Sequence, residues 1–349
     1  MKDPRQPRVL TTESNYRRDA LPGLISVIIP CYNASRYIGD ALESVFAQQS
    51  VSQEIILVDD GSQDGSPEFV EAHFPTVQVY RTSNQGPSAA RNFGTARSRG
   101  EFIQYLDADD LLAIDKLKIQ KSALVESNAD VAYGDWLKFR SSANGTKEVS
   151  ERVSRSLGLH PDLDLFNGFW CPPAAYLLRR SIVDRVGSWN PRLQVIQDAR
   201  FMLDCALRGG KFVYCAGIMA EYRLHRSGSV STRSRTAFLS DCLRSALEVQ
   251  DWWTSRGELD QPRRGAIVNA LNHVAAGSIE TAPDLFAEAC SAIAHLAPCY
   301  PSAWPFKIRF AVGVLGYRSA MSVAYRFRRC KAFFKSLVPA LFQGPVEDQ

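Results

Sequence analysis

Long apolar segments and paired cysteines are missing from this sequence of 349 residues. Its longest uncharged stretches, around residues 265–279 and 289–306, carry Asn, His or proline, so neither resembles the roughly 20 apolar residues that cross a bilayer. The eight cysteines are scattered without a CxxC pair, which argues against a zinc site and favours reduced thiols. The polar N-terminus lacks the apolar core of a signal peptide. We therefore expect a cytoplasmic protein without an integral membrane helix.

Acidic residues are missing from one long part of the chain. Between Ala289 and Val346 there is no Asp or Glu but there are eight Lys or Arg, although the net charge of the whole chain is only +4. Arg318, Arg326 and Arg329 fall at helical spacing among aromatic residues, so this block favours either a helix on an anionic membrane surface or a packed helical appendage with a solvated face. No nucleic-acid-binding motif accompanies the charge, and we expect no nucleic-acid partner.

The first part of the chain alternates short apolar runs with helical patterns. The β-branched runs suit strands buried on both faces of a parallel sheet, and short polar turns separate them from the helices. The predicted strands cover residues 24–30, 54–58, 77–81 and 102–106, and the predicted helices cover residues 36–49, 67–73 and 88–98. Alternation of this kind predicts an open α/β sheet, whose ligand sits at the carboxyl ends of the strands.

The later part of the chain has a different pattern. We predict strands at residues 174–178 and 211–215 with a helix at 199–208 between them, acceptor-binding loops within residues 141–167, and only helices beyond about residue 236. The predicted domains are a polar lead-in at 1–23, an α/β domain at 24–235 divided into halves 24–115 and 116–235, and a helical extension at 236–349. That extension is basic and amphipathic near residues 304–342.

Asp107 and Asp109 form the sharpest local feature, because they follow the predicted strand 102–106 directly. Two carboxylates at a strand end can hold one divalent cation and contact a ribose. Mg²⁺ or Mn²⁺ accepts oxygen ligands from one or two carboxylates and takes the rest from substrate phosphates and water. The alternative is a solvated turn in which Asp110 caps a helix. The position after a buried strand favours a diphosphate ligand with a divalent metal.

A second acidic turn, Asp59-Asp60-Gly61-Ser62, follows the predicted strand 54–58. A carboxylate there can accept the N–H of a base such as uracil, and Gly61 lets the backbone approach the ligand. The alternative is an Asx turn that caps the next helix. A phosphorylatable receiver domain also places an acidic pair at a strand end, but the chain is far too long for that module.

Four segments together resemble the donor half of the family 2 glycosyltransferases. They keep the family's order and spacing at residues 27–33 (VIIPCYN), 56–62 (ILVDDGS), 84–92 (NQGPSAARN) and 105–110 (YLDADD). The resemblance covers about residues 24–235. It implies a GT-A α/β fold, with a mostly parallel nucleotide-binding sheet flanked by helices, and the helical pattern beyond about residue 236 adds a helical C-terminal extension.

The resemblance also assigns roles within the donor half. The matching positions are Pro30, Tyr32 and Asn33 beside the nucleotide base, Asp60 holding that base, Arg91 near the donor diphosphate, Asp107 at the ribose and Asp109 at the metal. Asn92 has no ligand role in this assignment and is expected to cap or brace its loop.

In the acceptor half, residues 195–203 resemble the family's Glu-Asp segment at the start of a helix. Gln197 replaces the first acid, but Asp198 remains and is the expected catalytic base. Without an acid at 197, the pKa of Asp198 should be raised less by like-charge repulsion. Residues 222–229 resemble the basic closing segment near the diphosphate, which makes Arg223 and His225 candidate diphosphate contacts.

The implied activity is inverting transfer of one sugar, of hexosyltransferase type, in polysaccharide biosynthesis of the cell envelope. The expected donor is a nucleotide sugar, a UDP-sugar in particular, and the acceptor is a glycan or a lipid-linked glycan. Membrane attachment through the basic block would place the protein on the inner face of the cell membrane. A rival of another class is a non-catalytic nucleotide-sugar binder or scaffold of the same fold, motivated by Gln197. A nucleotidyltransferase would want a glycine-rich, lysine-containing phosphate loop, which the sequence lacks.

Overall fold

The computed structural model describes residues 20–142, 146–225, 234–296, 316, 318–320 and 322–323. These residues divide into two compact units. The first contains the described residues up to Leu193 and those from Gln197 to His225. The second contains Gln194–Ile196 and the described residues from 234 onward. Each unit is described by itself below.

The described part of the first unit contains a nine-stranded sheet in the order β3-β2-β1-β4-β8-β6-β9-β5, with β7 paired to β6. The strands are β1 (Leu21–Cys31), β2 (Ser52–Asp59), β3 (Gln78–Arg81), β4 (Gly100–Tyr105), β5 (Leu111–Leu112), β6 (Val131–Ser141), β7 (Lys147–Val153), β8 (Tyr176–Arg179) and β9 (Phe212–Arg223). The four strands predicted before residue 110 are present, and the predicted α/β fold is confirmed.

The donor half of the sheet brings the acidic turns to one edge. β1 lies between β2 and β4 and is parallel to both, and β2 is parallel to β3. Cys31 pairs with Asp59, and Ile28 pairs with Tyr105, so the three strands end near the same level. The turns after β2 and β4 therefore lie on either side of the turn after β1.

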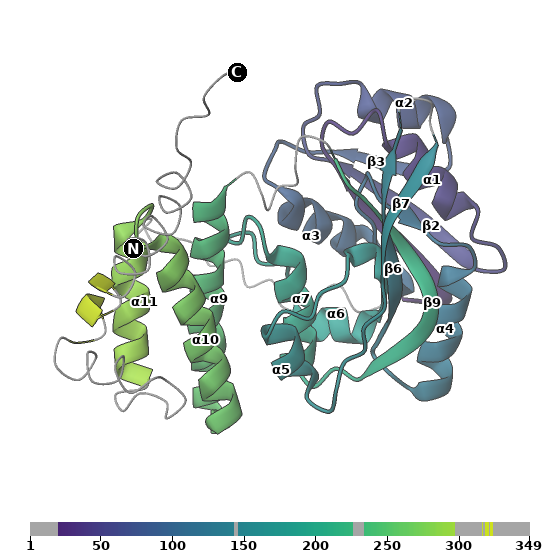
Figure 1. Ribbon diagram of the computed structural model, residues 1–349. Helices are drawn as coiled ribbons and strands as arrows, with labels where there is room; N and C mark the ends of the chain where they lie inside the picture. The colour runs from purple at the N-terminus through teal and green to yellow at the C-terminus, as the bar shows by residue number, and fades with distance from the viewer. Residues whose placement is uncertain are drawn as a thin grey trace, which may run out of the picture. The chain divides into compact units, whose positions relative to one another are not determined.

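Helices flank this sheet on both faces (Figure 1). They are α1 (Ile38–Phe46), α2 (Ser66–His73), α3 (Pro87–Arg97), α4 (Lys116–Ser127), α5 (Pro161–Phe166), α6 (Arg180–Val186) and α7 (Gln197–Leu207), with a 3₁₀ turn, η1, at Pro173–Ala175. Pro87 opens α3, where its missing N–H and fixed φ suit a first helical turn. Gly86 before it has a φ of 90°, a conformation that favours glycine.

The acceptor half contains more strand than the sequence predicts. β8 is antiparallel to β4 and β6, while β9 is parallel to β6 and continues to Arg223 rather than ending at Cys215. The expectation of loops throughout residues 141–167 is wrong, because β7 and α5 lie there. β7 is polar and mostly exposed, so no apolar alternation marks it in the sequence.

The described part of the second unit is helical, which confirms the helical extension up to Leu296. Its longer helices are α9 (Arg235–Ser255), α10 (Gln261–Ser278) and α11 (Pro283–Leu296). Ser234 and Asp260 cap α9 and α10 by accepting backbone N–H groups at 3.2 and 3.0 Å. The basic segment near residues 304–342 lies almost wholly outside the described residues.

Asp241 on α9 explains why residues 194–196 belong to the second unit. One of its carboxylate oxygens accepts the backbone N–H groups of Gln194, Val195 and Ile196 at 2.8, 2.7 and 3.3 Å. Nothing in the sequence pattern indicates this contact. Among the residues that the structure describes, no helix combines the length and apolar character needed to cross a membrane.

Candidate active site

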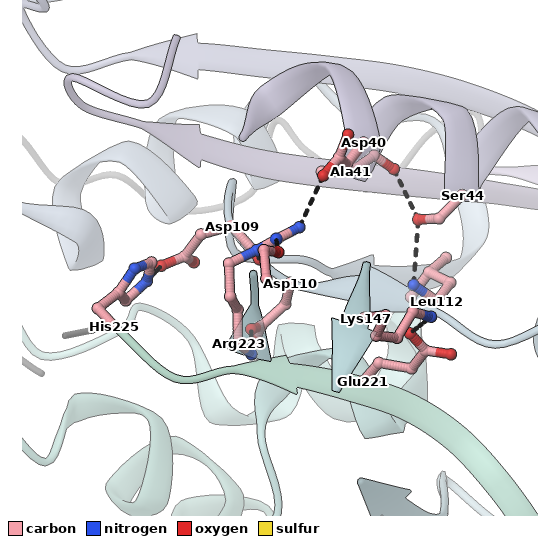
Figure 2. Close-up of polar contacts among 11 residues, drawn as sticks. Asp40, Ala41, Ser44, Asp109, Asp110, Leu112, Lys147, Glu221, Arg223 and His225 are labelled. Atoms are coloured by element: carbon pink, nitrogen blue, oxygen red, sulfur yellow. Dashed lines mark hydrogen bonds and ion pairs between the residues drawn. The ribbon is translucent and has the colours of Figure 1, made fainter. Parts of the chain in front are cut away.

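A cluster of carboxylates follows β4. Asp109 and His225 contact each other, with 2.6 Å between Oδ2 and Nε2, and Asp110 accepts the backbone N–H of Arg223 at 3.0 Å (Figure 2). Asp110 is 1% exposed. Burial raises the pKa of Asp110 well above its usual range, and the charges of Asp109 and Asp107 raise it further. The carboxylates of this turn are thus crowded enough to disfavour each other's charge, and either a proton or a bound cation would relieve that repulsion.

Asp198, in the first turn of α7, lies close enough to this cluster for its charge to act on Asp107. Burial raises the pKa of Asp107, Arg91 opposes that rise, and the carboxylates of Asp109 and Asp198 add to it. Burial also raises the pKa of Tyr222 above its usual range, with further contributions from all four of these carboxylates. The candidate base and the acidic turn after β4 are thus brought together from segments about ninety residues apart in the sequence.

Arg91 on α3 holds Asp107 through an ion pair between Nη2 and Oδ1. The guanidinium is 2% exposed and lies over the ring of Trp189, 4.5 Å from its centroid. Its Nε and Nη1 groups are buried with no hydrogen-bond partner in the described part of the chain. The Asn92 side chain binds the backbone of Trp189 twice. It accepts the backbone N–H at 2.8 Å and donates to the backbone carbonyl at 2.9 Å. Asn92 therefore braces a segment 97 residues away in the sequence rather than its own loop.

Arg223, a candidate diphosphate contact, is bound on all sides by protein groups. It donates to Asp40 on α1 at 2.9 Å (Figure 2), to the Asp109 carbonyl at 2.8 Å, and to the hydroxyl of Ser141. The residue is 5% exposed. This guanidinium therefore braces the acidic turn against α1 and β6, a role that the sequence pattern does not indicate.

The nucleotide-side candidates lie on the turn after β1. Tyr32 is 53% exposed, which leaves its ring available to a base. Asn33 has a φ of 50° and ties this turn to the one after β2, accepting the N–H of Gln63 at 2.8 Å and donating its own N–H to Ser62 at 2.9 Å. Pro30, at the end of β1, is partly buried.

Asp60 is 4% exposed, and both of its oxygens are hydrogen-bonded. They accept the backbone N–H groups of Gln85 and Gly86 at 2.9 and 2.8 Å, so Asp60 holds the turn that leads into α3. Asp59 binds more locally, accepting the N–H of Ser62 at 3.2 Å. Oδ1 also accepts the Thr82 hydroxyl at 3.5 Å, which leaves the second lone pair of Oδ2, and the contact of Asp60 with the base stays a prediction.

The residues present suit a divalent metal that takes most of its ligands from substrate. Within the described ranges, no three His, Cys, Asp or Glu side chains are grouped for metal binding. Asp109 and His225 form a pair, and the Asp109 side chain is 38% exposed. Mg²⁺ commonly uses one or two protein carboxylates together with substrate phosphates and water. The partly exposed carboxylate of Asp109 fits that chemistry for either metal, and the His225 imidazole beside it is a ligand better suited to Mn²⁺ than to Mg²⁺.

Two further features near Asp198 could not be predicted from the sequence pattern. Trp170, in the segment before η1, donates its indole N–H to Asp198 Oδ2 at 2.7 Å. Gln197, which stands where an acid was expected, has a buried Oε1 with no hydrogen-bond partner in the described part of the chain. Trp170 lies in an irregular segment, where no periodic pattern marks functional positions. Its contact with Asp198 is therefore visible only in the folded structure.

Residues 26–187 match the family model described as glycosyl transferase family 2. An uncharacterized glycosyltransferase of Nostoc sp. is 31% identical over 224 residues, which make up 61% of this chain and 69% of that protein. This chain belongs to glycosyl transferase family 2. An uncharacterized glycosyltransferase of Haemophilus influenzae is 38% identical over 117 residues, so the chain spans 47% of that relative and 32% of its own length is matched.

The family 2 assignment agrees with a likeness to a solved structure. The crystal structure of S. aureus TarS 1–349 in complex with UDP-GlcNAc superposes with a TM-score of 0.61 at 18% sequence identity. The match covers 86% of this chain and 91% of the TarS chain. At this identity the likeness shows the fold, and the predicted GT-A architecture is confirmed.

Proposed function

We propose that this family 2 chain is an inverting glycosyltransferase that uses a nucleoside-diphosphate sugar, with a UDP-sugar as the donor. The acceptor would be a glycan or a lipid-linked glycan of the cell envelope, and the sugar a hexose. The observation that carries the proposal is that Asp198 on α7 lies close enough to Asp107, which follows β4 beside Asp109, for its charge to raise the pKa of Asp107. A relative in the fold, TarS, has been crystallised with UDP-GlcNAc, which supports the donor class.

Inversion requires one base and stabilisation of one leaving group. Asp198 would remove the proton of the acceptor hydroxyl as that oxygen attacks the anomeric carbon from the face opposite the diphosphate. The bond from the anomeric carbon to the diphosphate oxygen breaks in the same step, so no covalent enzyme intermediate is needed. Burial of Arg91 against Asp107 supports a role in holding the ribose-binding carboxylate, and its contact with the donor diphosphate stays a prediction.

Asp109 and His225 are the residues that would hold the divalent metal. When bound, Mg²⁺ or Mn²⁺ supplies positive charge where the departing diphosphate develops its negative charge. His225 is kept in place by Tyr37, whose ring lies edge-on at 5.0 Å. In this assignment Arg223 acts through Asp109 rather than on the diphosphate directly.

A non-catalytic nucleotide-sugar binder is the second candidate function. The observation that favours it is Gln197, because an amide stands beside the candidate base where an acid was expected. Such a binder would hold UDP and metal through Asp107 and Asp109 and would show no turnover. Loss of turnover on removing the Asp198 carboxylate separates the two.

The donor site is tested by thermal shift of the full chain with UDP-, GDP- and dTDP-sugars, each with and without Mn²⁺. A ligand at 100 times its Kd stabilises by about 2.7 kcal/mol, which corresponds to about 5–10 °C for a domain of this size. We expect UDP-sugars to give such a shift only with Mn²⁺, and Asp109→Ala to abolish the part that depends on Mn²⁺.

Glu126→Ala, an exposed change on α4, is the charge-matched control and should keep the full shift. Metal-independent stabilisation by UDP-sugars that survives in Asp109→Ala would contradict the assignment of the metal site. A shift with GDP- or dTDP-sugars alone would contradict the UDP-sugar donor.

A further inference from the structure

Within the described ranges, the carboxylate of Asp198 accepts two hydrogen bonds of different kinds. Oδ1 accepts the backbone N–H of Ala199 at 2.8 Å, which is a local contact within the first turn of α7. Oδ2 accepts the indole N–H of Trp170 at 2.7 Å, across 28 residues of sequence. Only the second contact links the candidate base to another part of the fold. Each oxygen keeps a lone pair that can accept a proton.

The Trp170 indole is itself fixed by two neighbouring rings. It meets Trp136 on β6 edge-on at 5.2 Å and Tyr222 on β9 edge-on at 5.6 Å. Trp136 and Tyr222 also meet edge-on, at 5.9 Å, and Trp136 is only 4% exposed. Because β6 and β9 are paired in the sheet, these two rings form a rigid support, and the Trp170 N–H has one direction in which to point.

We propose that Trp170 is a positioning residue for the Asp198 base. Its hydrogen bond fixes the terminal torsion angle of the Asp198 side chain, so that the carboxylate faces the acceptor hydroxyl. The proposal rests on the proposed function, in which Asp198 receives the acceptor proton. The terminal torsion of a free aspartate is broad, whereas a general base must meet its proton within about 2.6–3.2 Å. An uncharged N–H fixes this torsion without adding a full positive charge beside the base.

The contact is tested first, by a measurement that needs no substrate. The chain has six tryptophans, so ¹⁵N-tryptophan labelling gives a small set of indole N–H signals, and Trp170→Phe identifies the one that belongs to Trp170. A bond to a carboxylate moves an indole proton downfield. We expect the Trp170 signal to move upfield in Asp198→Ala, while the signal of Trp252 on α9 stays in place. An unmoved Trp170 signal would overturn the proposal.

The role is tested by steady-state kinetics with UDP-GlcNAc and Mn²⁺, following UDP release in the presence and absence of acceptor glycans. Trp170→Phe keeps an aromatic ring and removes the donor. We expect its kcat to fall about tenfold with the KM for UDP-GlcNAc unchanged, the scale of one lost hydrogen bond to a charged group. Trp252→Phe should keep the wild-type kcat. Trp136→Phe disturbs the packing but keeps the hydrogen bond to Asp198, so its fall in kcat should be several-fold smaller than that of Trp170→Phe.

A double variant separates positioning from general damage. In an Asp198→Asn background, Trp170→Phe should lower kcat by less than about twofold, because the two residues act through one group. Equal losses in both backgrounds, or equal kcat values for Trp170→Phe and Trp136→Phe, would make Trp170 a packing residue and overturn the proposal. If Trp170→Phe does not fold, 3-benzothienylalanine at position 170 replaces the N–H with sulfur at nearly the same shape.

The same measurements keep this proposal separate from the proposed function. If Asp198→Asn retains wild-type turnover, Asp198 is not the base and both ideas fail. If Asp198→Asn loses turnover while Trp170→Phe does not, the base assignment stands and only the positioning role is refuted.

Discussion

Replacing Arg223 with methionine should destabilise the first unit and loosen the metal site. The side chain is 5% exposed, and its guanidinium donates to the Asp109 carbonyl, to Ser141 and to Asp40. The Asp40 side chain is 58% exposed and regains water when the pair breaks, so that contact contributes less than about 1 kcal/mol. The two remaining charge-assisted bonds contribute about 1.5 kcal/mol each, which gives a loss of about 3 kcal/mol in unfolding free energy.

The assay is urea unfolding of the full chain, combined with Mn²⁺-dependent binding of UDP. Loss of a group that orients a metal ligand typically weakens metal affinity by about 10–100-fold, so Arg223→Met should also weaken binding that depends on Mn²⁺. Arg152→Met, an exposed change on β7, removes the same charge and should alter neither quantity.

A diphosphate contact would behave differently from this brace. If Arg223→Met unfolded within about 0.5 kcal/mol of the wild type, the typical range of surface changes, but bound UDP more weakly, Arg223 would be a ligand contact. That result would refute the structural reasoning and restore the role that the family resemblance suggests.

Two other predictions concern a buried lysine and the basic block. Burial lowers the pKa of Lys116 well below its ordinary 10.5, so unfolding takes up a proton and stability falls as pH drops below that value, by at most about 1.4 kcal/mol per pH unit. Lys116→Met should remove this slope in urea unfolding from about pH 8 to 10, and equal slopes would contradict it. In the block, replacing Arg326, Arg328 and Arg329 with Gln should weaken liposome binding at low salt, at about 1 kcal/mol per residue near an anionic leaflet. Sedimentation that ignores salt and anionic lipid would favour a packed appendage.

The sequence predicts the donor half well because its strands carry a strong physical signal. The central residues of these strands, 25–29 in β1, 55–58 in β2 and 102–105 in β4, are mostly apolar and all buried, which is typical of strands covered on both faces of a parallel sheet. Their polar turns follow at once, so the positions of Asp60, Asp107 and Asp109 at one sheet edge could be predicted. The parallel direction of β1, β2, β3 and β4 follows from the alternation of strands and helices alone.

The acceptor half resists prediction for the opposite reason. β7 is polar on both faces, and its pairing with β6 depends on backbone hydrogen bonds that no side-chain pattern reports. The roles of Arg223 and Trp170 depend on partners far away in the sequence: Asp40 is 183 residues from Arg223. Such contacts follow from the completed fold, and short motifs cannot express them.

The central claim is that Asp198 is the base of an inverting transfer. It is tested most directly by kcat and donor Kd of Asp198→Asn, with UDP-GlcNAc as the first donor, since the amide keeps the shape and removes the basicity. We expect turnover to fall by roughly 10² or more, the usual contribution of a general base, while the donor Kd stays within a few-fold of the wild type. Turnover close to the wild-type rate would contradict the claim and assign the proton transfer to another residue.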